Sequence, residues 1–108
     1  MNRIKILIPV YNDWQSVFKL LENINVQAST LDDEFSVVIV NDTSTEERSE
    51  LPINLDNLRS VQIITMRENR GHARCNAAGL KYINDKEDFD YVIPMDGDGE
   101  DRPEELNL

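Results

Sequence analysis

Two carboxylates with one glycine between them, Asp96 and Asp98, follow directly after a short apolar run near the end of the chain. Side chains this close repel each other when both are charged, and burying them without a partner is costly. A hard divalent cation with oxygen ligands would remove that repulsion and could hold a diphosphate. Residues 95–104 therefore predict a metal site, against the simpler alternative of a solvated acidic turn.

Four strand-length apolar runs position this acidic segment. They span residues 4–10, 35–40, 61–66 and 91–95, and they are rich in Val and Ile. Such runs are typical of strands that are buried on both faces of a parallel sheet.

Two stretches between these runs have apolar side chains at helical spacing. The first begins after Asn12 or Asp13, either of which could cap a helix. Its apolar stripe consists of Trp14, Val17, Phe18, Leu21 and Ile24. The stripe of the second consists of Ala73, Ala77, Leu80 and Ile83, before a charged turn at 85–90. Residues 45–57 are polar and predict a loop or a short irregular helix.

The alternation of strands and helices predicts an α/β fold, a Rossmann-like parallel sheet of about four strands with flanking helices. Because crossovers between parallel strands are right-handed, the loops at the carboxyl ends of the strands should lie together. Those loops are the segments 9–13, 41–44, 67–71 and 96–101. We therefore expect the functional site at this edge of the sheet.

Composition limits the classes of function. The chain has 108 residues, enough for one small domain, and 40% of them are hydrophobic,. Its formal net charge of -10 argues against nucleic acid as a partner and against adhesion to an anionic membrane,. With a single cysteine and a single histidine, neither an internal disulfide nor a Cys/His zinc site is expected,.

Membrane and export signals are not expected either. No apolar segment approaches the ~20 residues of a membrane span, and basic residues lead straight into the first strand rather than into a signal peptide,. A cytoplasmic location follows as the expectation.

The end of the chain resembles an interrupted helix. Asp101 and Glu104 have the spacing of a capping box, with Pro103 in the first turn,. Because Leu108 follows so soon, we expect residues 1–108 to be a fragment of a longer domain. The fourth strand would then have an open edge through which a homo-oligomer could form.

Four motifs occur in order at the predicted strand ends. They are Ile8-Pro9-Val10-Tyr11-Asn12, Val38 to Ser44, Asn69-Arg70-Gly71 with Ala73, Asn76 and Gly79, and Asp96-Gly97-Asp98. Together they resemble the N-terminal, nucleotide-sugar-binding half of a family 2 glycosyltransferase with the GT-A fold, over nearly all 108 residues. The acidic run looks most like the branch that moves sugars onto polyprenyl phosphates, although Glu100 and Arg102 replace its more frequent Gln and Pro.

This resemblance implies a UDP-sugar or GDP-sugar as the donor. Pro9, Tyr11 and Asn12 would line the base. Asp42 would accept a hydrogen bond from a base N–H, because a carboxylate suits the imide of uracil or guanine.

The resemblance also implies Mg²⁺ or Mn²⁺ as the metal. Residues near the ribose or the phosphates would be Arg67, Asn69 and Arg74. Gly71 would let the backbone turn close to the nucleotide. Asp96 would contact the ribose or the metal, and Asp98 would ligate the metal that bridges the diphosphate. That metal would act as a Lewis acid on the departing nucleoside diphosphate.

In this family the acceptor pocket, and the base that deprotonates an acceptor hydroxyl, lie beyond the acidic motif. We therefore expect residues 1–108 to bind the donor with little or no transferase activity. For the whole protein, the resemblance implies inversion at the anomeric carbon, a saccharide or polyprenyl phosphate acceptor, and association with the cytoplasmic face of a membrane.

Two other classes of protein remain as alternatives. A nucleotidyltransferase would have a Gly-rich, basic loop after the first strand, whereas residues 9–13 contain neither Gly nor Lys. A non-catalytic, flavodoxin-like interaction module would have acidic residues after the first strand, where this chain has only Asp13.

Single residues have simpler interpretations as well. Asp42 could form only an Asx turn or a helix cap. Trp14 and Phe18 are expected in the core, His72 at the start of the second helix, and Cys75 as a small packing residue.

Overall fold

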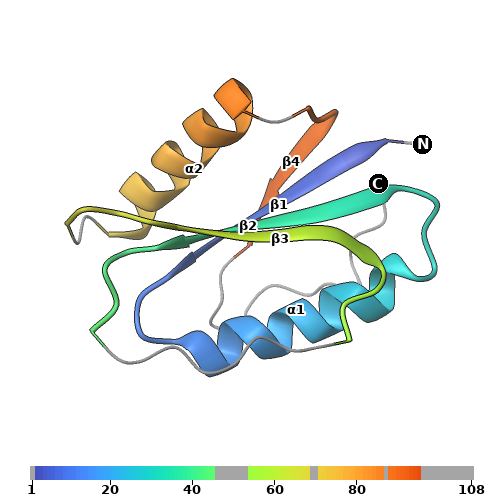
Figure 1. Ribbon diagram of the computed structural model, residues 1–108, viewed down its shortest axis with the longest axis horizontal. Helices are drawn as coiled ribbons and strands as arrows, with labels where there is room; N and C mark the ends of the chain where they lie inside the picture. The colour runs from blue at the N-terminus through green and yellow to red at the C-terminus, as the bar shows by residue number, and fades with distance from the viewer. Residues whose placement is uncertain (1, 46–53, 69–70, 87, 96–108) are drawn as a thin grey trace.

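The computed structural model describes residues 2–45, 54–68, 71–86 and 88–95, which form one four-stranded sheet with two helices (Figure 1). In chain order the elements are β1 (Arg3–Val10), α1 (Trp14–Ala28), β2 (Glu34–Asn41), β3 (Leu58–Thr65), α2 (His72–Lys86) and β4 (Tyr91–Pro94). The strands lie in the order β3-β2-β1-β4, and every neighbouring pair is parallel. The predicted α/β, Rossmann-like sheet is therefore confirmed.

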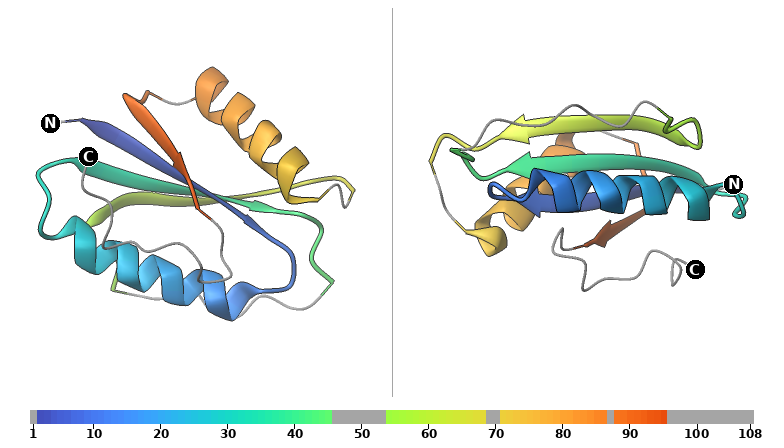
Figure 2. Two further views of the ribbon diagram at one scale, coloured as in Figure 1. Left: turned by 180° about the vertical axis from the view of Figure 1, so that it is seen from behind. Right: turned by 90° about the horizontal axis from the view of Figure 1, so that it is seen from below.

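The two helices cover opposite faces of the sheet. In Figure 1, α2 lies above the sheet and α1 lies below it, and the left view of Figure 2 shows the same arrangement from behind. The side chains of β1 alternate between these faces, because successive residues of a strand point to opposite sides. Ile6 and Ile8 belong to the core under α1, whereas Leu7 belongs to the core under α2.

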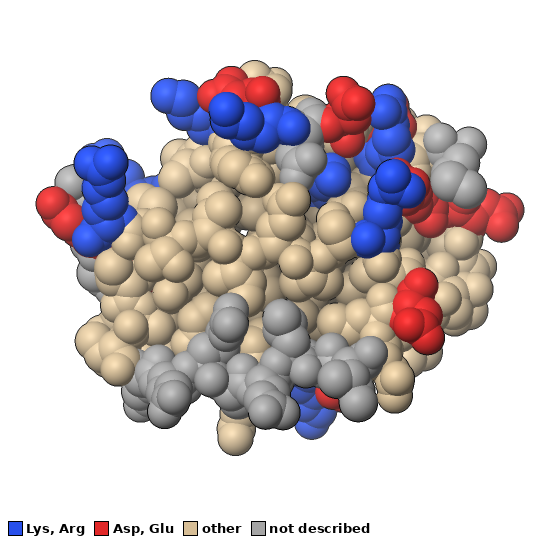
Figure 3. All heavy atoms as spheres, in the orientation of Figure 1, with Lys and Arg blue, Asp and Glu red and all other residues tan. Residues whose placement is uncertain are grey.

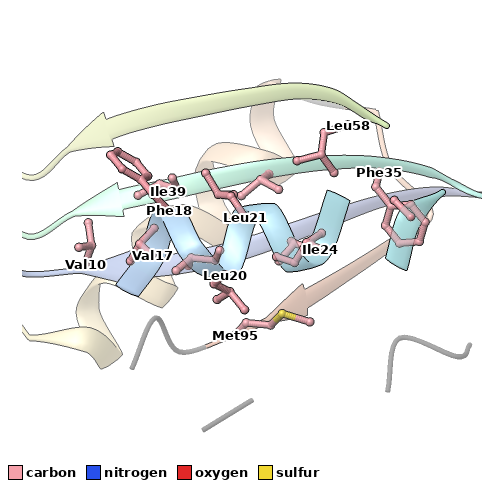
Figure 4. Packing of buried hydrophobic residues seen from close by; sticks show 14 of the residues in the cluster. Val10, Val17, Phe18, Leu20, Leu21, Ile24, Phe35, Ile39, Leu58 and Met95 are labelled. Atoms are coloured by element: carbon pink, nitrogen blue, oxygen red, sulfur yellow. The ribbon is translucent and has the colours of Figure 1, made fainter. Parts of the chain in front are cut away.

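The core under α1 is the larger one and contains the apolar stripe predicted for the first helix. Figure 4 shows side chains of α1 facing those of β2, with Met95 beside them from the end of β4. Trp14 and Phe18 are both buried, and their ring centroids are 5.8 Å apart. Their expected place in the core is therefore confirmed.

Three details of the sequence prediction need correction. β3 begins at Leu58 rather than Val61, because Leu58 pairs with Phe35 of β2. A register shift follows this pair, and the mostly polar sequence Leu-Arg-Ser does not reveal the pairing. α2 extends to Lys86, into the predicted turn. Asp13 is the N-cap residue of α1, but its side chain makes no capping hydrogen bond.

The edges and the helices bear on two other expectations. Among the described strands, β4 pairs only with β1, so the edge suggested for self-association is present there, and self-association itself stays a prediction. Within the described ranges, neither helix has the length and apolar character needed to span a membrane.

The strand order reverses between β1 and β4, and Pro9 lies where these two strands separate. Met95 N–H donates to the carbonyl of Leu7 at 2.9 Å. Among the described residues, this is the last hydrogen bond between β1 and the segment that continues β4. In a parallel ladder the next donor would be the N–H of Pro9, which proline lacks. The ladder therefore ends at the switch point, where sheets of this kind bind their ligands.

Gly79 brings α2 close to the sheet, and we expect Gly79→Ala to destabilise the protein by about 1–2 kcal/mol. A Cβ at this position would overlap with Leu7 Cδ1 and approach Val40 Cγ2 to 3.0 Å. The gain in helix propensity from alanine, up to about 1 kcal/mol, offsets only part of that overlap. Urea unfolding of the two proteins measures the difference.

Gly71→Ala is the matched comparison. Gly71 has a φ of 84°, and among the described residues that are not its chain neighbours no atom lies within 4 Å of the place that a Cβ would occupy, so we expect alanine there to meet backbone strain,. A second substitution separates steric overlap from backbone strain. Leu7→Val makes room for a Cβ at position 79, so it should restore stability to Gly79→Ala but not to Gly71→Ala. A Gly79→Ala protein as stable as the parent would contradict the close packing.

Candidate functional site

The loops after β1 and β2 are joined by the amide side chain of Asn12. Its Oδ1 accepts a hydrogen bond from Thr45 N–H at 2.8 Å, and its Nδ2 donates to Thr45 Oγ1 at 3.1 Å. The Asn12 N–H donates to Ser44 Oγ at 2.8 Å. Asn12 has a φ of 64°, a conformation that asparagine tolerates better than most residues,. These contacts fix the β1–α1 loop against the end of β2.

Backbone strain marks the second of these loops. Thr43 has a φ of 55°, which is rare for a β-branched residue, and its buried Oγ1 has no hydrogen-bond partner within the described ranges,. The turn is held by Asn41, whose Oδ1 accepts from Ser44 N–H at 2.9 Å. Strain of this kind is concentrated at ligand sites, so it directs attention to the neighbouring Asp42.

Asp42 is buried, with an exposed fraction of 1%, and its carboxylate reaches the start of α2. Its Oδ2 accepts a hydrogen bond from Gly71 N–H at 2.8 Å, directly before the first residue of the helix. A negative charge here also interacts favourably with the helix dipole. Asp42 therefore caps α2 from the loop after β2. This confirms that Asp42 caps a helix, but the helix begins about 29 positions later in the sequence rather than directly after Asp42.

Cys75 lies in the first turn of α2, where its N–H donates to the carbonyl of Gly71 at 3.1 Å. Its thiol is buried, and burial, followed by the influence of the Asp42 carboxylate, raises the pKa of Cys75 to about 11. The expected packing role of Cys75 is confirmed by its burial.

Arg67 and Arg74 lie together in a groove between the end of β3 and α2. The groove has a volume of about 770 Å³ and is lined by Thr65, Met66, Arg67, Glu68, Arg74, Ala77, Ala78 and Lys81. Three basic side chains at one groove give local positive charge to a chain that is acidic overall,. In Figure 3, Lys and Arg side chains lie along the margins of the face that is shown, and the centre of that face carries no charged side chains.

The remaining predicted site residues are placed only in part. Tyr11 is exposed, at 42%, in the loop after β1, and Pro9 is buried within that strand. Asn69, Asp96 and Asp98 lie outside the described residues.

Two observations bear on the predicted metal site, namely the hydrogen bond at the end of β4 and the chemistry of the residues that would bind the metal. Met95, the last described residue before the acidic motif, donates its N–H to β1 beside the switch point. The carboxylates of the motif that follows in the sequence are the kind of oxygen ligand that Mg²⁺ or Mn²⁺ prefers,. Among the residues that the structure describes, no group of three His, Cys, Asp or Glu side chains could hold a metal ion.

The predicted residues thus form two groups, one around Asn12, Asp42 and Gly71, and one in the groove of Arg67 and Arg74. Sequence reasoning missed Thr45 and Lys81. Lys81 follows Arg74 by two helical turns, a spacing that could have indicated it.

We expect Asn12→Gly to lower the free energy of unfolding by about 1 kcal/mol, because both side-chain contacts with Thr45 are lost. Asn12→Ala should lower it by about 2 kcal/mol, because alanine also strains at positive φ. The backbone bond to Ser44 survives in both variants. Equal stability of all three proteins in urea unfolding would show that the loops are held by other contacts.

Known proteins resemble this chain in sequence. A family model described as Glycosyl transferase family 2 matches residues 5–108. The undecaprenyl-phosphate 4-deoxy-4-formamido-L-arabinose transferase of Proteus mirabilis (strain HI4320) is 27% identical over 106 residues, which are 98% of this chain and 32% of that protein. The transferase of the same name from Photorhabdus laumondii is 28% identical over 108 residues, with the same coverage of both chains. The chain thus spans about a third of the length of these relatives.

A solved structure supports the fold. TarS of S. aureus superposes with a TM-score of 0.63 at 21% identity, over 89% of this chain and 16% of TarS. This similarity concerns the architecture alone, and it agrees with the GT-A arrangement expected from the motifs. Because the family model covers nearly the whole sequence, the chain belongs to glycosyl transferase family 2.

Proposed function

We propose that this chain binds a nucleoside-diphosphate sugar, a UDP-sugar or a GDP-sugar, as the donor part of a glycosyltransferase. The observation that supports this most directly is the joining of the Asn12 and Asp42 loops at the carboxyl edge of the sheet, beside the switch between β1 and β4. Ligands of open α/β sheets bind at that position. Family membership gives the class of ligand.

Within this proposal the base binds near Pro9, Tyr11, Asn12 and Asp42. An ionised carboxylate has about four acceptor positions, so Asp42 can take a base N–H in addition to the bond from Gly71 N–H,. Because Asp42 is so deeply buried, the base reaches it only when the surrounding loops open.

The phosphates and the metal occupy the other end of the proposed site. Arg67, Asn69 and Arg74 bind the ribose and phosphates, and Gly71 allows close approach of the backbone. Asp96 and Asp98 hold Mg²⁺ or Mn²⁺, which supplies Lewis-acid stabilisation of the leaving diphosphate. The groove of Arg67 and Arg74 contributes positive charge, which a diphosphate needs on an acidic protein,.

We further propose that the whole protein transfers the sugar, with inversion, to a polyprenyl phosphate or a saccharide at the cytoplasmic face of a membrane. The names of the two bacterial relatives support a polyprenyl phosphate. On this proposal residues 1–108 supply donor binding, and the acceptor site is formed by other parts of the protein.

Calorimetric titration tests the donor proposal. UDP and then GDP are titrated into the protein with Mn²⁺, and again after EDTA. We expect one nucleotide to bind and EDTA to abolish its binding. Tighter binding of the triphosphate would favour a nucleotidyltransferase, and labelling by a small phosphodonor would favour the interaction module. Binding of neither nucleotide by a folded sample would contradict the proposal.

A further inference from the structure

We propose that Thr43 is a specificity residue that reads the carbonyl group beside the ring N–H of the nucleotide base. This inference rests on the proposed function, in which Asp42 accepts that N–H, and it adds a second base contact from the neighbouring residue. The ligand is then a nucleotide whose base has an N–H next to a carbonyl, the pattern that uracil and guanine share.

Thr43 has a hydroxyl group that the described part of the chain leaves without a partner. Its Oγ1 is buried and makes no hydrogen bond there, although the residue as a whole remains partly exposed. Burying a hydroxyl without a partner costs free energy, so such atoms are rare in folded proteins and need an explanation. A ligand that supplies the missing partner is an explanation that fits a residue next to Asp42.

The backbone of Thr43 gives a second, independent indication. Its φ of 55° lies in the left-handed region, which is an outlier for a β-branched residue,. Contacts on both sides hold it there, because Asn41 Oδ1 accepts a hydrogen bond from Ser44 N–H at 2.9 Å and Asp42 N–H donates to the carbonyl of Val10 at 2.8 Å. Glycine would avoid this strain, so threonine here lowers the stability of the free protein.

The chemistry of Asp42 and Thr43 matches one edge of a base. In uracil and in guanine a ring N–H lies directly beside a carbonyl, so a donor and an acceptor face the same way. An ionised carboxylate can only accept hydrogen bonds, whereas a hydroxyl can donate one. Asp42 takes the N–H, and the Thr43 hydroxyl donates to the carbonyl oxygen. Adenine and cytosine have no ring N–H beside a carbonyl, so they would leave these buried groups unpaired.

Both residues are held in an ordered loop before the base arrives. Asp42 Oδ2 accepts a hydrogen bond from Gly71 N–H at 2.8 Å, and Asn12 Oδ1 accepts one from Thr45 N–H at 2.8 Å, two residues after Thr43. A loop that is ordered in the free protein avoids part of the entropic cost of binding. When the loops open to admit the base, its carbonyl oxygen provides the acceptor that the Thr43 hydroxyl lacks.

Thio analogues of the nucleotide test this contact, because sulfur is a weak hydrogen-bond acceptor. The dissociation constant of an analogue divided by that of UDP measures how strongly the replaced oxygen is recognised. 2-Thiouridine 5′-diphosphate and 4-thiouridine 5′-diphosphate each replace one of the two carbonyls that flank the N–H. Only one of the two ratios should depend on residue 43, and the other analogue is the internal control. If GDP is the nucleotide that binds, 6-thioguanosine 5′-diphosphate replaces the carbonyl beside the N–H.

We expect Thr43→Val, which keeps the shape and removes the hydroxyl, to reduce this ratio about two- to tenfold, the range for a neutral hydrogen bond. Thr43→Ser keeps the hydroxyl and should preserve the ratio. Thr65→Val makes the same change at the end of β3, and its ratio should equal that of the parent protein. Both Thr43 variants should still discriminate against 3-methyluridine 5′-diphosphate, which lacks the N–H that Asp42 accepts.

A measurement without nucleotide tests the strain at Thr43. Thr43→Gly relieves the positive φ and removes the buried hydroxyl, so the midpoint of urea unfolding should rise. A lower midpoint would mean that the Thr43 side chain stabilises the free protein, and it would overturn the inference. Equal ratios in Thr43→Val and in a parent protein that binds UDP or GDP would also overturn it and leave the donor proposal standing. Failure of the parent protein to bind either nucleotide overturns both.

Discussion

Asp98→Asn is expected to weaken the Mn²⁺-dependent binding of UDP or GDP roughly a hundredfold or more. Loss of a residue that only supports a metal ligand already costs about 10- to 100-fold in affinity, so loss of a ligand itself should reach at least the upper limit. Asparagine keeps the size of the side chain and removes the charge. Calorimetry at increasing Mn²⁺ concentration measures the effect, and high Mn²⁺ should recover part of the binding.

Asp101→Asn is the matched control, because it removes one negative charge from the same segment. The sequence spacing of Asp101 and Glu104 predicts a helix-capping role for Asp101, so the affinity for the nucleotide should change by less than about twofold,. If both variants weakened binding equally, the general charge of the segment would explain the effect. If Asp98→Asn bound the nucleotide as the parent does, the metal site would lie elsewhere.

The sheet and both helices could be predicted because their signals are local. The strands β1 and β2 are continuous apolar runs, and α1 has one apolar stripe, so neighbouring residues contain the information. The start of β3 was missed for the same reason, because Leu58 and Arg59 look like part of a polar connection. Their strand character depends on pairing with β2, where Leu58 pairs with Phe35 and Arg59 binds Glu34 at 3.2 Å.

The contacts within the site depend on residues distant in sequence. Asp42 and Gly71 are separated by 29 positions, and Asn12 and Thr45 by 33. Motif resemblance placed Asp42 and Asn12 at the right edge of the sheet. It did not indicate that Asp42 caps α2, because that contact arises only when the helix packs across two strands.

Asp42→Ala is expected to lower the free energy of unfolding by roughly 2 kcal/mol, because Gly71 N–H loses a charged acceptor at a buried position,. Asp42→Asn keeps one acceptor oxygen and loses the charge that interacts with the dipole of α2, so its cost should be about 1 kcal/mol. Urea unfolding measures both values.

Asp13→Ala is the matched control, since it removes a carboxylate at the start of the other helix. Its side chain makes no capping hydrogen bond, so the stability should change by less than about 0.5 kcal/mol,. Equal losses in Asp13→Ala and Asp42→Ala would mean that Asp42 does not cap α2.

The milder variant also separates the two roles of Asp42. Asp42→Asn should remain folded at about 25 °C, because its expected cost is a small part of the stability of a typical domain, so its nucleotide affinity can be compared with that of the parent protein. If the carboxylate accepts a base N–H, the variant should bind UDP more weakly and bind 3-methyluridine 5′-diphosphate as the parent does. If Asp42 only caps α2, the affinities for the two nucleotides should fall together, because the same disturbance of the helix start affects both.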